Sequence, residues 1–265
     1  MNPATRELLA SIANARAQLG TPSLSDERVH EARKALKKAR AALRLLRPGL
    51  GEALFRAENA ALRDAGRCLS PLRDTKSQLD ALAALRRRHA GKLRPTRAGG
   101  GLDGIESALR ADQVAARRKL ELQPCLALLE RALRAELVRV DSSVLEKGLR
   151  RIYRKGKKTF RMAGKAGTPE ALHEWRKQVK YLHDALDALH AGNGGKAARV
   201  AKRADKLAER LGHDHDLAVL SQRERAPKKL RKLIAGRREK LQKRALRLGE
   251  KLYGRKPKRL AASLS

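Results

Sequence analysis

Apolar residues recur at steps of three and four along most of the chain, the spacing that places them on one face of an α-helix. Ala32, Leu36, Ala39 and Leu43 show this spacing clearly. Leu and Ala carry most of the 42% hydrophobic fraction, whereas the chain has only two Phe, three Tyr and one Trp. Both observations predict an all-α fold, because Leu and Ala favour helices while sheets are rich in β-branched and aromatic residues.

Glycine, proline and capping residues mark where the helices are expected to begin and end. Ser25 is a candidate N-cap, Pro48 should end the segment that follows it, and Pro227 should begin the last long helix. Another long helix is expected over about 141–163. The basic residues 254–265 follow the last long helix and are expected to form a frayed tail.

A six-residue pattern occurs twice in the chain. ValHisGluAlaArgLys at 29–34 matches LeuHisGluTrpArgLys at 172–177, which lies 143 positions later. A weaker pair follows in the same order at an offset of 142. It consists of LeuSerProLeuArgAsp at 69–74 and LeuGlyHisAspHisAsp at 211–216, both expected to form turns. Two matches in one order at nearly one offset indicate a duplicated unit of about four helices.

The duplication predicts one domain, 1–265, that is made of two repeats. The first helical bundle is expected over about 5–137 and the second over about 141–253. The junction between them should lie near 137–141, and the basic tail 254–265 completes the domain.

The charge of the chain predicts an anionic partner. Lys and Arg total 63 against 28 Asp and Glu, a formal net charge of +35. Because so many like charges repel one another in a compact chain, a bound anion is expected to offset part of them. Nucleic acid, an anionic membrane surface and inorganic phosphate polymers are the three candidate classes.

The chain carries no signal for secretion or membrane insertion. No apolar run approaches the ~18 residues of a membrane-spanning helix, and the N-terminal segment lacks a secretory apolar core. Cys68 and Cys125 cannot build a disulfide framework, so buried thiols in a reducing compartment are expected. We therefore expect a cytoplasmic protein.

The repeated helix carries a stripe of basic residues in both copies. At about 100° per residue, the first stripe holds His30, Arg33, Lys37, Arg40 and Arg44, and the second holds His173, Arg176, Lys180 and His183. Each stripe borders the apolar face instead of lying opposite it. Like charges at i and i+4 repel by a few tenths of a kcal/mol per pair, so such a run has no benefit for folding. An extended anion such as a phosphate chain would compensate it, since the first stripe spans roughly 21 Å at ~1.5 Å per residue.

Further basic residues could extend this surface. Arg150, Arg154 and Lys158 share one face of the segment that precedes the second repeat, and Lys206 and Arg210 share another face further on. The alternative for all of them is an ordinary solvated helix face. The sequence repeat supports these residues less strongly than it supports the histidine helices. An extended anion-binding surface and a solvated helix face therefore both stay open.

These motifs resemble the CHAD family, the conserved histidine α-helical domain. The resemblance rests on the repeated His-Glu-x-Arg-Lys-x-x-Lys helix, on the Leu-Gly-x-x-x-Asp-like segment after each copy, and on the basic segment 150–158. It covers nearly the whole chain, from about Thr5 to Tyr253. It implies two four-helix bundles related by pseudo-twofold symmetry, with a basic groove or channel between them.

The resemblance also implies a ligand, because members of this family bind inorganic polyphosphate and associate with polyphosphate granules. Carried over by position, His30, Arg33, Lys37 and Arg40 would line the site from one half, and His173, Arg176 and Lys180 from the other. The second copy departs from the first at its far end. His183 stands where the first copy has Arg40, and Asp187 stands where it has Arg44.

Non-catalytic binding is the expected function, and two alternatives stay open. Nonspecific binding of a DNA or RNA backbone is the first, although 2% aromatic residues leave little for base stacking. The second is phosphate transfer through a nucleophilic histidine, but no paired carboxylate or glycine-rich phosphate loop accompanies either histidine. Glu31 and Glu174 are expected to pair with Lys34 and Lys177 on the helix surface.

No cofactor or metal ion is expected. His213-Asp214-His215-Asp216 contains metal-ligating residue types, but its alternating spacing suits a strand. The context predicts a turn that enters a helix, where Asp serves as a cap. Histidines beside several cations should favour their neutral form until an anion binds, so affinity should rise as the pH falls.

Overall fold

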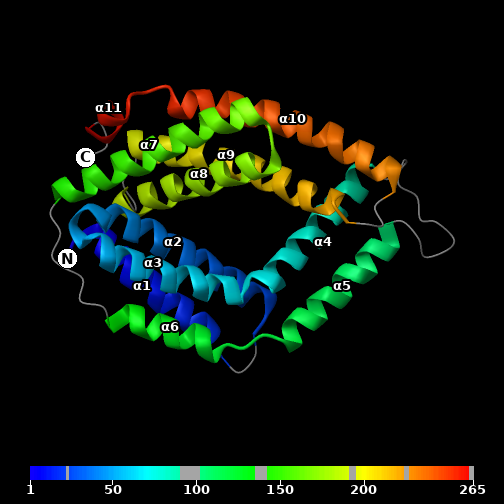
Figure 1. Cartoon of the computed structure of the whole chain (residues 1–265), viewed down its shortest axis with the longest axis horizontal. Coiled ribbons are helices and arrows are strands. Elements are labelled where there is room, and N and C mark those ends of the chain that lie inside the picture. The colour runs from blue at the N-terminus through cyan, green and yellow to red at the C-terminus, as the bar shows by residue number, and fades with distance from the viewer. Residues whose placement is uncertain (22–23, 90–101, 135–141, 191–194, 224–226, 263–265) are drawn as a thin grey trace.

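The computed structural model of the chain describes residues 1–21, 24–89, 102–134, 142–190, 195–223 and 227–262. These residues form eleven helices and no strand (Figure 1), which confirms the all-α prediction. The first half contains α1 (Pro3–Leu19), α2 (Asp26–Leu50), α3 (Glu52–Cys68), α4 (Ser70–Arg88), α5 (Leu102–Arg118) and α6 (Gln123–Arg134). The second half contains α7 (Ser142–Ala166), α8 (Pro169–His190), α9 (Lys196–Ser221), α10 (Lys228–Tyr253) and α11 (Pro257–Ala262).

The helices pack in two groups that face each other. Helices α1, α2, α3 and α6 contact one another in a ring, and so do α7, α8, α9 and α10. Helix α2 joins the groups because it contacts both α7 and α8. Helices α4 and α5 pair at one end of the molecule, where α4 also contacts α9 (Figure 1). The expected pseudo-twofold relation between two four-helix bundles stays a prediction.

A continuous apolar core joins the two histidine helices, α2 and α8. Leu36 and Leu43 from α2 and Trp175 and Leu182 from α8 are buried in the same cluster. Their basic neighbours on both helices are therefore held at the boundary between this core and the space between the two groups. The regular spacing of apolar residues thus positions the charged stripe as well as the core.

The α2–α7 contact depends on a glycine. A Cβ added at Gly148 would lie 2.7 Å from the Cα of Leu45, a separation that real Cβ atoms essentially never show. Any larger residue at this position would push α7 away from α2.

The ends of two segments differ from the sequence prediction. Pro48 lies inside α2, which continues to Leu50; a proline this near the end disturbs only the last turn. The C-terminal tail is not frayed as far as residue 262, because α11 packs on α7 with Leu260 only 2% exposed. The Tyr153 hydroxyl donates to the carbonyls of Leu252 and Arg255, which fixes the connection to α11. The N-cap Ser25 is confirmed, because its hydroxyl accepts a hydrogen bond from Arg28 N. The predicted junction 137–141 lies outside the described residues.

The second of the two predicted turns is wrong. The first half does break at Leu69, between α3 and α4, and Pro71 stands in the first turn of α4. At the equivalent position the second half has His213, whose backbone N–H allows the helix to continue, and α9 runs through without a break. Asp214 is therefore no cap; it is 2% exposed and accepts bonds from Arg238 on α10.

Candidate functional site

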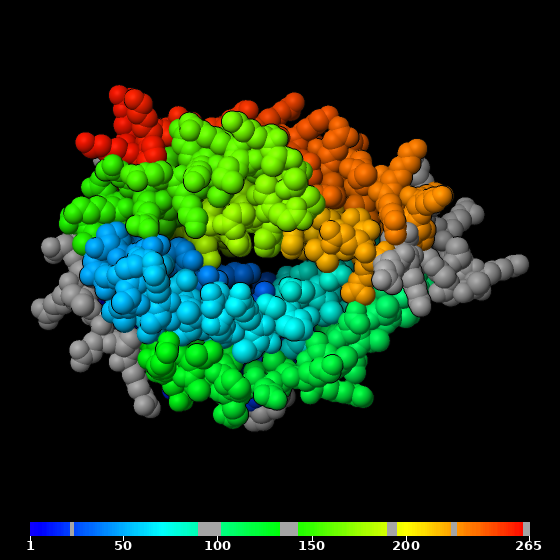
Figure 2. Space-filling model, viewed as in Figure 1, coloured from blue at the N-terminus to red at the C-terminus, as the bar shows by residue number. Residues whose placement is uncertain are grey.

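A cavity of about 430 Å³ lies between the two groups of helices, with α2 and α4 on one side and α8 and α9 on the other. Figure 2 shows the molecule hollowed along this boundary between its two halves. We call this cavity the groove. It is lined by Arg33, Lys37, Arg40, Ser70, Arg73, Asp74, Ser77, Gln78, His173, Arg176, Lys177, Lys180, Tyr181, Asp184, His215, Asp216 and Val219. Seven of these side chains are Arg or Lys and three are Asp, so the lining has a surplus of positive charge.

The groove arginine of each histidine helix rests on the segment that belongs to the second sequence match. Arg33 Nη1 donates to Gly66 O at 2.9 Å and to Ser70 Oγ at 2.8 Å. Arg176 lies against Gly212, where an added Cβ would be 3.3 Å from both Nε and Nη2. Ser70 and Gly212 occupy equivalent positions in the repeat, separated by 142 residues. The duplicated segments therefore support equivalent arginines on opposite walls.

Several buried nitrogen atoms in the groove lining have no hydrogen-bond partner among the described residues. They include Nε of Arg33, Nε of Arg176 and Nδ1 of His173. A buried polar atom without a partner costs about 1–3 kcal/mol, and an anion that accepts hydrogen bonds would lower this cost.

Lys37 stands among cations from both walls. Its side chain keeps an exposed surface where it lines the groove. Desolvation by the surrounding protein atoms, together with the charges of Arg33, Arg176 and Lys180, lowers the pKa of the Lys37 amine to about 8. An anion bound beside the Lys37 amine would favour its charged form and so raise its pKa again.

The histidine of the second repeat packs against another histidine. The rings of His173 and His215 have centroids 4.2 Å apart. Burial, followed by the positive charge of Arg176, lowers the pKa of His173, and burial followed by His173 and Arg176 lowers that of His215 to about 4. Burial and Arg73 likewise lower the pKa of His30. All three imidazoles therefore favour the neutral form, in the predicted direction.

Two of the groove carboxyl groups have a raised pKa. Asp184 is 3% exposed, one of its oxygens has no partner among the described residues, and burial raises its pKa. Its other oxygen lies 3.5 Å from Lys180 Nζ. Burial also raises the pKa of Asp216. Both shifts favour the neutral acid and so reduce the negative charge of the lining.

Comparison with known proteins identifies the family. The sequence matches the CHAD domain over residues 4–225. The chain belongs to the CHAD family. This confirms the resemblance that the repeated histidine helices indicated. No curated protein matches the chain. None of the described helices is long and apolar enough to cross a membrane.

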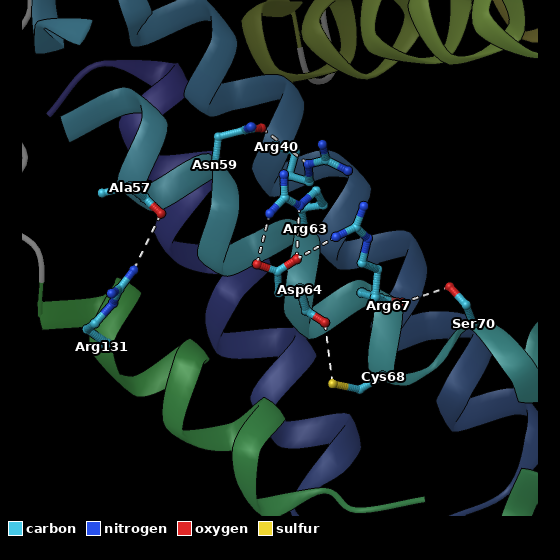
Figure 3. Close-up of polar contacts among 10 residues, drawn as sticks. Arg40, Ala57, Asn59, Arg63, Asp64, Arg67, Cys68, Ser70 and Arg131 are labelled. Atoms are coloured by element: carbon cyan, nitrogen blue, oxygen red, sulfur yellow. Dashed lines mark hydrogen bonds and ion pairs between the residues drawn. The ribbon is translucent and has the colours of Figure 1, made fainter. Parts of the chain in front are cut away.

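Of the five residues predicted on α2 of this CHAD domain, three line the groove. Arg33, Lys37 and Arg40 line it, and Arg40 Nε also lies 3.4 Å from Asn59 Oδ1 on α3 (Figure 3). Arg44 does not line it; its guanidinium lies 3.8 Å from the centroid of the Tyr181 ring, which brings α2 against α8. His30 is exposed on α2 and is also absent from the lining.

In the second half, His173, Arg176 and Lys180 line the groove as predicted, but His183 does not. The ring of His183 lies between α8 and α9, with Nδ1 3.3 Å from Ala201 O and Nε2 3.5 Å from Asp187 Oδ2. His183, about one turn beyond Lys180 on α8, therefore contacts α9 and the Asp187 carboxylate and does not face the groove. The expected surface pairs of Glu31 with Lys34 and of Glu174 with Lys177 are both present.

The more distant basic residues do not line the groove. Arg154 and Lys158 are exposed on α7, and Arg150 is half-buried there. Lys206 is exposed on α9, and Arg210 lies 3.3 Å from Glu209 on the same helix. Arg63 and Arg67, which occupy a comparable face of α3, both bond to Asp64 (Figure 3). For most of these residues the structure favours a solvated face.

Sequence reasoning missed four groove residues of this CHAD domain as ligand candidates. They are Arg73, Lys177, Tyr181 and His215. Arg73 and His215 belong to the weaker repeated motif, so that motif was the available signal. Nothing in the spacing of Tyr181 distinguishes it from an ordinary helix residue, since its place follows from how α2 packs on α8.

Proposed function

We propose that this CHAD domain binds inorganic polyphosphate in the groove without catalysing a reaction on it. One observation carries the proposal: cations of both repeated histidine helices line a single cavity with a surplus of positive charge. Arg33 and Lys37 come from α2, and Arg176 and Lys180 come from α8. Phosphate oxygens accept charge-assisted hydrogen bonds from such groups.

A chain of phosphates fits this arrangement better than one phosphate. The cations from Arg33 to Arg40 extend over roughly 10 Å of α2 at ~1.5 Å per residue, and those of α8 face them. A single anion would reach only part of this array. A linear polyanion would place successive charges along both walls and release counterions as it binds.

The lining is less suited to nucleic acid. Tyr181 is the one Phe, Tyr or Trp among the described groove residues, and the Arg44 guanidinium lies over one face of its ring at 3.8 Å. The imidazoles of His173 and His215 pack against each other. These contacts leave less ring surface for a nucleobase, whereas stacking supplies much of the affinity for single strands. Nonspecific contact with a nucleic-acid backbone remains the alternative function.

The histidine environment supports binding over phosphate transfer. A reactive histidine is typically oriented by a hydrogen bond to a second group, as the general-base histidine of a catalytic triad is by its carboxylate. His173 Nδ1 has no such bond among the described residues, and its ring instead packs against His215. We propose that these histidines position neighbouring cations and contact the anion once protonated.

The proposal extends to architecture and location. We propose that α1, α2, α3 and α6 on one side, and α7 to α10 on the other, are pseudo-twofold-related bundles, because each set contacts in a ring. The repeated sequence motifs support this relation. Within a cell, a domain with this ligand would associate with polyphosphate granules in the cytoplasm.

Competition between polyanions tests the function. Labelled long-chain polyphosphate is bound to the protein and displaced with unlabelled polyphosphate, single-stranded RNA or duplex DNA at matched phosphate concentration, in rising salt. We expect polyphosphate to displace the label most effectively. Equal displacement by nucleic acid would contradict the proposal, and shortening of the chain during incubation would favour the enzymatic alternative.

Groove substitutions locate the binding site. Lys37→Gln together with Lys180→Gln should weaken polyphosphate binding by about a hundredfold, since each removes a charge-assisted contact of ~1.4 kcal/mol, which is about tenfold in affinity. Lys158→Gln with Lys206→Gln removes the same charge from exposed positions and is the matched control. Equal losses in both variants would show that general charge, and not the groove, binds the polymer.

A further inference from the structure

A second cavity of about 450 Å³ adjoins the groove between α4, α9 and α10. Arg73, Ser77 and Asp216 line both cavities, so the two spaces meet at these side chains. Beyond them the second cavity is lined by Arg87 and Arg88 from α4 and by Arg237 from α10. We call it the arginine cavity.

Two arginines of this cavity, Arg88 and Arg237, lack an ion-pair partner among the described residues, although Asp80 and Asp216 also line the cavity. Burial, followed by the charges of Arg88, Arg244 and Arg210, lowers the pKa of Arg237. Neither Arg88 nor Arg237 has a carboxylate within ion-pair distance in the described part of the chain. Asp80 also lines the cavity, but its carboxylate lies 2.6 Å from Lys76 Nζ. Three helices thus bring arginines together although they repel one another.

The arginine cavity has a well-packed frame. Leu82 and Leu85 from α4, Leu217 from α9 and Ile234 from α10 are buried in one apolar cluster. Next to Arg237, Arg238 is turned the other way and bonds to the buried carboxylate of Asp214. The buried Ile234 and the bond of Arg238 to Asp214 together fix the rotation of α10 about its axis. The packing of α10 therefore places Arg237 at the cavity.

We propose that one polyphosphate chain runs from the groove past Arg73 into the arginine cavity, so that the protein selects long chains over short ones. The inference rests on the proposed function of the groove. From Arg73 to Arg88 the path follows α4 for roughly 22 Å at ~1.5 Å per residue, in addition to the roughly 10 Å along α2. A short chain can occupy only one of the two cavities. A long chain can occupy both, and its affinity is higher because binding in the second cavity is then intramolecular. Arg237 and Arg244 lie beyond residue 225, where the family match ends.

The test compares chain lengths in a variant of the arginine cavity. Arg88→Gln with Arg237→Gln removes two cations of this cavity and leaves the groove intact. Lys229→Gln with Lys232→Gln removes two exposed charges of α10 that line neither cavity. Titration calorimetry with tripolyphosphate and with long-chain polyphosphate, over a series of salt concentrations, measures affinity and its salt dependence.

For long chains we expect the cavity variant to lose about tenfold in affinity. Its logarithmic salt slope should fall by about 1.5–2, because each lost phosphate contact reduces the slope by roughly 0.7–1. Tripolyphosphate binding should be the same as in the unchanged protein, and the control should keep its length preference. Equal loss of long-chain affinity in both variants, or equal affinity of the unchanged protein for both lengths, would overturn the proposed path alone. Failure of the unchanged protein to bind either polymer would overturn the proposed function together with it.

Discussion

Among single residues, Lys37 is a groove side chain whose pKa the fold lowers strongly. Two arginines and a second lysine surround it, and its pKa is lowered to about 8. At pH values above this pKa the free protein holds a neutral amine, while a bound polyanion favours the charged form and raises the pKa. Polyphosphate binding is then coupled to proton uptake.

Affinity for polyphosphate should therefore fall as the pH rises from about 7 to about 9.5, because part of the binding free energy is then used to protonate Lys37. In Lys37→Gln the decrease over this range should disappear, and the affinity should already be low at neutral pH. Calorimetry in two buffers of different ionisation enthalpy measures the proton uptake directly. A pH profile that is identical in the variant would show that another group titrates.

His173 gives a second residue-scale prediction. Burial and Arg176 lower its pKa, so the free protein holds a neutral ring at neutral pH. Polyphosphate should raise this pKa, which NMR titration of the imidazole protons would detect as a shift of the midpoint to higher pH. His89 lines no described cavity and serves as the reference ring. An unmoved His173 midpoint would assign this histidine a purely positioning role.

At the scale of elements, the close approach of α7 to α2 is one of the contacts that join the two groups of helices at the core. Gly148→Ala should destabilise the protein by about 2–3 kcal/mol, because the added methyl group meets the Leu45 backbone. Urea unfolding followed by circular dichroism measures the change in the free energy of unfolding.

Gly164→Ala is the matched control on the same helix. A Cβ there would meet only the Leu246 side chain, at an ordinary 3.7 Å. Because alanine favours a helix more than glycine, this variant should be unchanged or stabilised by about 0.5 kcal/mol. Equal effects of the two substitutions would contradict the role assigned to the α2–α7 contact.

At the scale of the whole molecule, the net charge of +35 works against the compact state. A polyanion in the groove should offset this repulsion and bind only the folded form. Long-chain polyphosphate should therefore raise the melting temperature of the protein at low salt, in proportion to the logarithm of its concentration above Kd. Scanning calorimetry would show the rise.

Sodium chloride at the same ionic strength supplies the comparison, because it screens charge without filling the groove. It should raise the melting temperature less than polyphosphate does. In the Lys37→Gln, Lys180→Gln variant the effect of polyphosphate should shrink toward that of the salt. Equal stabilisation by both in the unchanged protein would indicate screening alone.

The helical class, the repeated motifs and four cations that line the groove could be predicted from the sequence alone. Helical periodicity depends only on the order of residues, and it places Arg33, Lys37, Arg176 and Lys180 on comparable stripes without any knowledge of packing. The four residues do line one groove. The family match over residues 4–225 confirms the resemblance to the CHAD family that the repeated motifs indicated.

Where each basic stripe ends, and which further residues line the groove and the arginine cavity, depends on the tertiary structure. Arg44 turns onto Tyr181 and His183 turns to α9 because neighbouring helices cover the far ends of α2 and α8. Arg73 and Arg237 enter because α4 and α10 pack beside α9. Such relations join residues distant in the chain, and helical spacing carries no information about them, since periodicity describes one helix and not the angle at which two helices meet.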